Sequence, residues 1–499
     1  MRWAGAAIAL LWLLVGIWQA SFKPLPPGTR TAGAEVPADA DSVRLLSDVT
    51  TADAYGHPVL QQQIFDEALR VIAEARRFVV LDVHLFNAVL PTAEPAGVSP
   101  LRPLAQELAA ALLAARRSHP ALCVLLVTDP VNDLHGALPA SELQALERAG
   151  AAVVRADLDA LRDSNPAWTA LWRVAIRWWA GGGSGAGTLA SPIDHGPERV
   201  RFATWARLFN GKSDHRKVLL ADDGADGLVG IVGSANAHDA SSAHTNLALE
   251  LRGAALQPLL ASELALARAA GWRDGDGSAA RSGLLEAASG AAAARPVRGA
   301  MVGVRVLTEG AIRDALLEHL GQAARGDVVD VAVFQLADRS IVEALLGAAQ
   351  RGAEVRLLLD PNRDAYGHTH SGLPNRPVAS ELVSRSDGAI RVRWYRTHGE
   401  QFHPALVMIS SAQRSWLSVG SANLTRRSLG DYDLEANIAV EMPAAAPLAL
   451  EAHRWFETLW TNRAPAGIEY TADFGTFADP AQASFWAYRL LEATGLGGY

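Results

Sequence analysis

The feature that most constrains this chain is an internal repeat that begins after residue 41. In each copy a helical run precedes an apolar run: QQQIFDEALRVIAEAR before FVVLDVHLF, and GAIRDALLEHLGQAARG before DVVDVAVFQL. A second helical run then leads into an apolar strand that ends in Asp-Pro, at residues 129–130 and 360–361. Because helices alternate with strands, each copy predicts an α/β unit with a largely parallel sheet. Two such units predict two homologous α/β/α halves in a pseudo-twofold arrangement.

The repeat also divides the 499 residues into domains. We expect the first half over residues 41–272, the second half over 301–465 and a C-terminal tail over 466–499. The segment 273–300 is rich in Ala, Gly and Ser, which is typical of a linker. The single cysteine, Cys123, lies in the apolar run ALCVLLV and is predicted to be a buried strand residue.

Residues 1–22 form a hydrophobic N-terminal segment. No charged residue lies between Trp3 and Ala20, and about 20 apolar residues span a bilayer. A cleavable signal peptide needs small residues at the cut, and Trp18 fits that poorly. An uncleaved signal-anchor is therefore favoured over two alternatives, a cleaved signal peptide and a buried first helix.

A second segment with potential membrane contact is SNPAWTALWRVAIRWWAGGGSGAG. Trp168, Trp172 and Trp179 recur there at helical spacing and form one apolar stripe. The stripe fits an interfacial membrane helix and equally a helix packed on its own domain. Exposed tryptophans would favour the membrane, and buried ones the packed helix.

The first copy carries the strongest chemical motif, H-x-K-x4-D, and its residues His215, Lys217 and Asp222 are the catalytic candidates of this half. On a strand, His215 and Lys217 would point to the same face. An ammonium neutralises a phosphoryl oxygen, and an imidazole attacks phosphorus or donates a proton to a leaving oxygen. The chain has lysine only at positions 23, 212 and 217, so two of its three lysines flank His215. The pattern favours an anionic, phosphorus-centred substrate.

The second copy keeps the histidine but loses the rest of this motif. His403 aligns with the first histidine, whereas Ala405 replaces the lysine and Ser410 the aspartate. We expect His403 to be catalytic; a relic in a decayed half is the alternative. Loss of one charge-assisted donor costs about 10²–10³ in rate. Arg426 or Arg427 could substitute in part.

A Gly-Ser-Ala-Asn tetrapeptide follows in both copies. Ser234 and Asn236 in the first copy, and Ser421 and Asn423 in the second, offer hydroxyl and amide donors. We expect them to bind the phosphate of the substrate. Capping of a turn is the alternative.

Two glutamates, Glu250 and Glu435, lie in the apolar strands that come next, and we align them with each other. An unpaired carboxylate would be costly there. We expect each glutamate to hold a ring nitrogen of a histidine and fix its tautomer. Pairing with a nearby arginine is the alternative.

Taken together, these motifs resemble the phospholipase D superfamily, whose members carry two H-x-K-x4-D motifs, each followed by a GSxN-like segment. The resemblance covers residues 41–465, and the tract DPNRDAYGHTHSGLPNRPVASEL is similar to bacterial membrane-associated members grouped with phospholipases D and cardiolipin synthases. It implies that both motifs meet in one cleft. One histidine then becomes a phosphohistidine and the other protonates the leaving alcohol, with no metal and no cofactor. The donor passes to water or to a second alcohol.

The sequence therefore predicts a membrane-anchored phosphodiesterase or phosphatidyltransferase acting on phospholipids. The net charge of −8 argues against nucleic acid as a partner, although a phospholipase D-like nuclease stays an alternative. Ala405 and Ser410 motivate a further alternative, a lipid-binding pseudoenzyme. We expect an N-terminal anchor in the bacterial inner membrane and a catalytic part on the periplasmic side. Secretion after signal cleavage is the other possibility.

Overall fold

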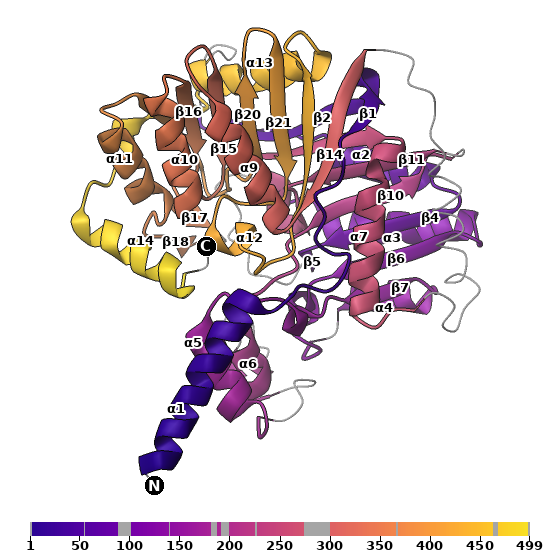
Figure 1. Cartoon of the computed structure of the whole chain (residues 1–499). Helices are drawn as coiled ribbons and strands as arrows, with labels where there is room; N and C mark the ends of the chain where they lie inside the picture. Colours follow the sequence, from indigo (N-terminus) through magenta and orange to yellow (C-terminus); the bar gives the residue numbers. More distant parts are fainter. Residues whose placement is uncertain are drawn as a thin grey trace.

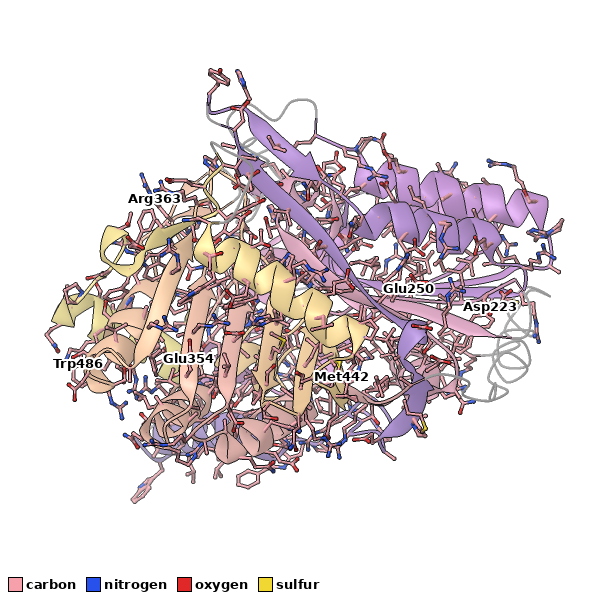
Figure 2. All side chains as sticks on the ribbon, turned by 90° about the horizontal axis from the view of Figure 1, so that it is seen from above. Asp223, Glu250, Glu354, Arg363, Met442 and Trp486 are labelled. Carbon is pink, nitrogen blue, oxygen red and sulfur yellow. The ribbon has the colours of Figure 1, made fainter. Side chains whose placement is uncertain are left out.

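A computed structural model describes residues 2–497 except 54, 88–100, 139, 181–186, 191–198, 225–226, 274–299, 366–367 and 463–467. It shows two α/β halves packed together, with one N-terminal helix projecting from them (Figure 1). Figure 2 views the two halves from above, with Glu250 in the first and Glu354 in the second. The expected linker 273–300 lies almost wholly outside the described residues.

The first half is built on an eight-stranded sheet with the order β3-β2-β13-β11-β10-β4-β6-β7. Alternate residues of β4 face opposite sides: Val79 and Leu81 pack on the outer helices, whereas Phe78 and Val80 face the centre of the molecule. The strands are β2 (Val43–Ala52), β3 (Pro58–Gln61), β4 (Phe78–Val83), β6 (Cys123–Thr128), β7 (Ala152–Arg155), β10 (Lys217–Asp222), β11 (Leu228–Gly233) and β13 (Asn246–Arg252). The outer helices are α2 (Ile64–Glu74), α3 (Leu104–Ser118) and α4 (Ser141–Arg148), and the inner helix is α7 (Gln257–Ala269).

The second half repeats this plan on a nine-stranded sheet with the order β1-β14-β22-β21-β20-β15-β16-β19-β23. Its strands are β1 (Val36–Asp39), β14 (Met301–Thr308), β15 (Val328–Val333), β16 (Glu354–Leu359), β19 (Ile390–Tyr395), β20 (Ala405–Ser410), β21 (Arg414–Gly420), β22 (Ala436–Pro443) and β23 (Thr471–Asp473). The outer helices are α9 (Gly310–Gln322), α10 (Arg339–Gln350), α11 (Asn375–Arg385) and α14 (Gln482–Thr494), and the inner helix is α13 (Pro447–Thr461).

The two sheets confirm the internal duplication. The order β2-β13-β11-β10-β4-β6-β7 of the first sheet matches β14-β22-β21-β20-β15-β16-β19 of the second. Strands β11 and β13 contact β21 and β22 across the centre, where both sheets, α7 and α13 share one apolar core. Cys123 is 4% exposed within this core, as predicted.

The expectation of largely parallel sheets is wrong. Only β4-β6-β7 and β15-β16-β19 pair in parallel, and the other neighbours in both sheets are antiparallel. The physical reason is the connection length. Only five residues, 223–227, separate the antiparallel neighbours β10 and β11, whereas parallel neighbours need a long crossover through a helix.

Segments outside the predicted halves complete the second sheet. Strand β1 precedes residue 41 but pairs with β14, and β23 follows residue 465 but pairs with β19. In α14, Tyr488 is fully buried and its hydroxyl accepts a hydrogen bond from Arg339 at 2.7 Å. The N-terminal linker and the tail therefore pack on the second half, while the domain limits stay a prediction.

The N-terminal helix α1 (Arg2–Ile17) continues into the π-helical turn η1 (Trp18–Phe22). The span Gly5–Phe22 is long and apolar enough to cross a membrane, and 11% of it is buried. A helix with so small a buried share is not a helix of the protein core. The indole N–H of Trp12 donates to the carbonyl of Ala167 at 3.0 Å in the neighbouring helix α5 (Pro166–Leu171).

The Trp-rich segment combines the two structures considered for it. Trp172, in the π-helical turn η5 (Trp172–Ile176), is 4% exposed and packs on α6 (Phe202–Leu208). Trp178 and Trp179 are 72% and 68% exposed. The helices α1, α5 and α6 lie together below the two halves (Figure 1). The Gly-rich residues 181–186 at the end of this segment lie outside the described part of the chain.

Candidate active site

The histidines of the two copies meet between the halves. The ring centroids of His215 and His403 are 6.4 Å apart, and both rings line a cavity of about 560 Å³. Each histidine is held by the opposite half: the backbone N–H of His215 donates to the carbonyl of Leu434 at 2.9 Å, and that of His403 to the carbonyl of Thr245 at 2.8 Å. Both halves are therefore needed to position either ring.

The Asp-Pro aspartates fix the same two segments from within each half. Asp129 accepts a hydrogen bond from the backbone N–H of Asp214 at 2.7 Å, and Asp360 accepts one from that of Phe402 at 2.8 Å. Asp214 and Phe402 directly precede the two histidines. Sequence reasoning gave these aspartates no role, although their recurrence in both copies was a usable signal.

The carboxylate of Glu435 holds the ring of His215. The two oxygens of Glu435 lie 3.0 and 3.1 Å from Nδ1 of His215, and the hydroxyl of Ser421 donates to one of them. Burial raises the pKa of Glu435 to about 7, against the opposing effect of the Lys217 charge. The expected contact of Glu435 with a histidine is confirmed, and the histidine is the one from the other half.

In the first half, an asparagine takes the position that Glu435 has in the second. Oδ1 of Asn246 lies 3.3 Å from Nδ1 of His403, and the hydroxyl of Ser234 donates to the same oxygen at 3.2 Å. In both halves the backbone N–H of the GSAN serine donates to the carbonyl of the residue after this partner. Asn246, and not Glu250, is therefore the structural counterpart of Glu435.

The histidine-orienting role expected for Glu250 is wrong. Its carboxylate pairs with Arg44 at 2.5 Å, Arg252 at 2.9 Å and Arg70 at 3.5 Å, so the arginine alternative is the correct one. Glu250 follows Asn246 by four residues on β13, a displacement of about 13 Å along the strand. That displacement carries the carboxylate out of the site.

Lys217 is a buried ammonium directly beside the first histidine. Its Nζ donates to the carbonyl of His215 at 2.7 Å, and Lys217 is the first residue of β10. Burial lowers the pKa of Lys217 to about 8. Burial, followed by the Lys217 charge, also lowers the pKa of His215 and of His403 well below the ordinary value. Ala405, 6% exposed, opens β20 at the matching position, so only one half contributes a lysine.

Asp222 is not part of the site, contrary to its assignment as catalytic. It ends β10, about 16 Å along the strand from Lys217. Its carboxylate accepts the backbone N–H groups of residues 76–78 and so fixes the start of β4. The role is structural, and Ser410 at the matching position pairs with Ser415 at 3.0 Å. The loss of the second motif aspartate therefore leaves the cavity unchanged.

The four GSAN side chains divide into two kinds. Asn236 and Asn423 line the cavity, and Oδ1 of Asn236 is buried without a hydrogen-bond partner among the described residues. Ser234 and Ser421 are 1% and 2% exposed and do not line it. Their hydroxyls hold the partners of the histidines, so the expected phosphate contact is wrong for the serines and stays a prediction for the asparagines.

Two further histidines adjoin the pair. The ring of His84 lies 4.9 Å from that of His215, and its Nδ1 donates to a backbone carbonyl at 2.8 Å. Phe334 occupies the corresponding position in the second half, 5.1 Å from His403. The ring of His244, a residue to which the sequence motifs give no role, lies 6.0 Å from that of His403, and burial lowers the pKa of His244 to about 3. His84 was missed because it ends an apolar strand.

Of the two arginines after the second GSAN, only Arg427 lines the cavity. It forms an ion pair with Asp433 at 3.0 Å, and its charge contributes to the lowered pKa of His215. Arg426 instead donates to a carbonyl at 3.1 Å and to the hydroxyl of Tyr432 at 2.9 Å. Arg427 is therefore the arginine placed to support the single lysine.

Comparisons with known proteins agree with this geometry. Residues 316–460 match the family model described as cardiolipin synthase, phospholipase D-like domain. The structure is similar to phosphatidylserine synthase from Haemophilus influenzae, at 10% identity and a TM-score of 0.51, over 93% of this chain and 96% of that one. The likeness shows that the two chains share a fold, and the family match over residues 316–460 confirms the expected resemblance to the phospholipase D superfamily.

Two further solved structures match the chain with lower TM-scores. Polyphosphate kinase from Porphyromonas gingivalis matches at 15% identity and a TM-score of 0.43, over 90% of this chain and 53% of that one. A phospholipase D family member from Salmonella typhimurium matches at 18% identity and a TM-score of 0.27, over 34% of this chain and 97% of that one. No curated protein shows significant sequence similarity to the chain.

Proposed function

We propose that this phospholipase D-like chain is a membrane-associated phosphodiesterase or phosphatidyltransferase that acts on phospholipids through a covalent intermediate on His215. The observation that carries the proposal is the asymmetry of the two histidines. His215 has a carboxylate partner and an adjacent ammonium, whereas His403 has a neutral amide partner and no lysine in its own half.

The partners assign different tasks to the two rings. A carboxylate accepts the Nδ1–H of His215, which leaves the lone pair of Nε2 for attack on phosphorus. The ring becomes cationic in the phosphohistidine, and Glu435 stabilises that charge. The amide oxygen of Asn246 also fixes the Nδ1–H tautomer of His403, but it favours a cation less. His403 is therefore suited to proton transfer.

The reaction then proceeds in two displacements. Nε2 of His215 forms a bond to phosphorus, and the bond from phosphorus to the leaving alcohol oxygen breaks. The anionic phosphate of the bound substrate favours protonation of His403 at Nε2, and His403 donates that proton to the leaving oxygen. Water or a second alcohol next gives its proton to His403 and attacks phosphorus. The nitrogen–phosphorus bond breaks and His215 is restored. Hydrolysis and transfer differ only in the acceptor.

The phosphate oxygens would lie between the remaining cavity groups. Arg427, Asn236 and Asn423 line the cavity and supply a guanidinium and two amide donors, and Lys217 adds positive charge from its place beside His215. The guanidinium of Arg427 is planar, so it does not reproduce the hydrogen-bond geometry of a lysine ammonium. It does restore part of the charge lost with Ala405.

Membrane association is supported by the N-terminal part of the structure. The apolar span Gly5–Phe22 is largely exposed, and the exposed Trp178 and Trp179 lie beyond the helix that packs on it. The guanidinium of Arg177 lies 4.4 Å from the ring centroid of Trp178, a pairing that suits a lipid–water interface. We propose an uncleaved anchor in the bacterial inner membrane with the catalytic halves on the periplasmic side. An intact N-terminus in the mature protein would distinguish it from secretion after cleavage.

The decisive experiment is phospholipid turnover by the full chain in vesicles of mixed phospholipids, with headgroup release and new lipid species followed by mass spectrometry. We expect turnover that disappears in His215→Ala and persists in His57→Ala, a control at a histidine whose side chain is 76% exposed. Turnover that survives in His215→Ala would refute the mechanism. If the natural chain and both variants are folded but none of them turns over phospholipid, the enzyme proposal is refuted.

The second candidate function is a lipid-binding pseudoenzyme, favoured by the single observation that Ala405 leaves the second half without its lysine. It predicts that the natural chain binds vesicles without turnover and that Ala405→Lys creates activity. The enzyme proposal predicts turnover by the natural chain. The two are separated by the same vesicle assay.

A further inference from the structure

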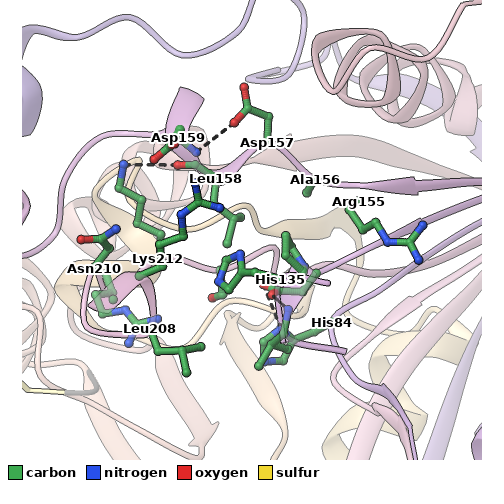
Figure 3. A pocket seen from close by; sticks show the side chains of 17 residues that line it. His84, His135, Arg155, Ala156, Asp157, Leu158, Asp159, Leu208, Asn210 and Lys212 are labelled. Carbon is green, nitrogen blue, oxygen red and sulfur yellow. Dashed lines mark hydrogen bonds and ion pairs between the residues drawn. The ribbon is translucent and has the colours of Figure 1, made fainter. Parts of the chain in front are cut away.

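A second cavity adjoins the first on the side of the helices α5 and α6. It has a volume of about 440 Å³, and His84, Ser213 and Arg427 line both cavities. Its wall is formed by residues 155–159, which follow β7, and by residues 207–213, which lead from the end of α6 toward His215. Figure 3 shows His84 and His135 close together, with Lys212 and Asn210 on another side of the space.

Several polar groups of this cavity lack partners within the described part of the chain. The guanidinium of Arg207 makes no hydrogen bond or ion pair there, and its Nε is buried. Asn210 is 8% exposed, and its Oδ1 is buried without a partner. Because a buried polar group without a partner is destabilising, this pattern indicates groups that a ligand satisfies.

The other arginine and lysine side chains of the cavity are already paired with carboxylates. Arg155 pairs with Asp133 at 2.7 Å, and Lys212 pairs with Asp163 at 2.5 Å. Asp129 is committed to a backbone N–H of the catalytic segment. Asp157 and Asp159 also line the cavity, and the carboxylate of Asp157 accepts the backbone N–H of Asp159 at 3.0 Å. Arg427, which lines both cavities, pairs with Asp433 at 3.0 Å, so Arg207 is the arginine of this lining without an ion-pair partner in the described part of the chain.

The wall of the cavity is preformed by the two lysines outside the motif. Nζ of Lys212 donates to the carbonyls of Leu158 and Leu161 at 3.2 and 2.8 Å, and Nζ of Lys23 donates to the carbonyl of Leu161 at 3.1 Å. Lys23 directly follows the membrane-span candidate. The cavity is therefore fixed to the base of the N-terminal helix.

We infer that the second cavity binds the polar part of the acceptor alcohol, a hydroxyl compound that also carries an anionic group. The inference rests on the proposed function. Arg207 binds the anion and Asn210 accepts a hydrogen bond from a hydroxyl, while the acceptor hydroxyl reaches phosphorus past His84. A phosphorylated polyol in solution and a polyol headgroup on a second phospholipid share this chemistry.

The test measures the ratio of transfer to hydrolysis by the full chain in vesicles of phosphatidylglycerol and phosphatidylethanolamine. Free glycerol 3-phosphate, uncharged glycerol and increasing phosphatidylglycerol serve as separate acceptors. In Arg207→Gln we expect a transfer ratio ~10- to 100-fold lower for an anionic acceptor and an unchanged ratio for glycerol. Arg207→Lys should recover part of the loss. The acceptor that shows the loss identifies the source of the anion.

The matched control is Arg199→Gln, at an exposed arginine that does not line the cavity, and it should keep the wild-type ratio. An unchanged ratio in Arg207→Gln, with normal turnover, would overturn the inference and leave the proposed function standing. Absence of turnover in the wild type would overturn the proposed function. Calorimetric binding of glycerol 3-phosphate, lost or kept in Arg207→Gln, would then decide the inference.

Discussion

Replacement of Glu435 by glutamine isolates the interaction that separates the two histidines. The substitution keeps the shape of the side chain and removes the charge that lies 3.0 Å from Nδ1 of His215. The phosphohistidine carries a positive ring charge, so the lost contact is a charge-assisted hydrogen bond. Lys217 lies beside His215, and the carboxylate of Glu435 also helps to balance its charge.

The expected magnitude follows from that contact. A hydrogen bond to a charged group contributes about 1.5–3 kcal/mol, which corresponds to a decrease of roughly 10- to 150-fold in kcat/KM. If the amide turns its N–H₂ toward Nδ1, the ring is also held in the wrong tautomer, and the loss can reach about 10⁴-fold. The assay is the initial rate of phospholipid turnover on vesicles, with thermal unfolding as the check on folding.

Glu250→Gln is the matched control, because the same substitution falls on a buried carboxylate that the sequence aligns with Glu435. Its partners are Arg44, Arg70 and Arg252, so turnover should be unchanged. The reasoning is refuted if Glu250→Gln lowers kcat/KM as much as Glu435→Gln, or if Glu435→Gln retains full activity.

Three other outcomes follow from the same structure. Lys217→Ala should lower kcat/KM about 10²–10³-fold and Lys217→Arg should not restore it, as measured by vesicle turnover. The pH profile of kcat/KM should be bell-shaped: activity rises as Glu435 ionises near its pKa of about 7 and falls as Lys217 loses its proton near its pKa of about 8. Glu435→Gln should remove the acidic limb, and its persistence would contradict the assignment. Arg216→Leu leaves the buried Glu263 and Glu309 unpaired and should lower the free energy of unfolding by about 3–5 kcal/mol in urea titrations; a change below 1 kcal/mol would contradict it.

Much of the fold was predictable from the repeat. The helices and strands of both halves follow the apolar periods of the sequence, and the matching strand orders follow from the duplication. The direction of pairing was not predictable from period alone, because an apolar run fits parallel and antiparallel neighbours equally well. The small number of residues between the two apolar runs, 223–227, was the available signal for antiparallel neighbours.

The motif residues of the site were predictable from the sequence. The contacts that residues of one half make with the other half were less predictable. His215 and His403 meet as expected, but the partner of His403 is Asn246, four residues before the glutamate that the sequence suggested. A neutral asparagine in an apolar strand gives no electrostatic signal. The cross-half contact to Glu435 depends on docking of the two sheets, which no local pattern encodes.

The most direct test of the account is to locate the covalent intermediate. The full chain would be mixed for a single turnover with phospholipid labelled at phosphorus, quenched in alkali to preserve phosphohistidine, and mapped by mass spectrometry. We predict the label on His215, its accumulation in His403→Ala and its absence in His215→Ala. A label on His403, or turnover without any phosphohistidine, would contradict the assignment of His215 as the nucleophile.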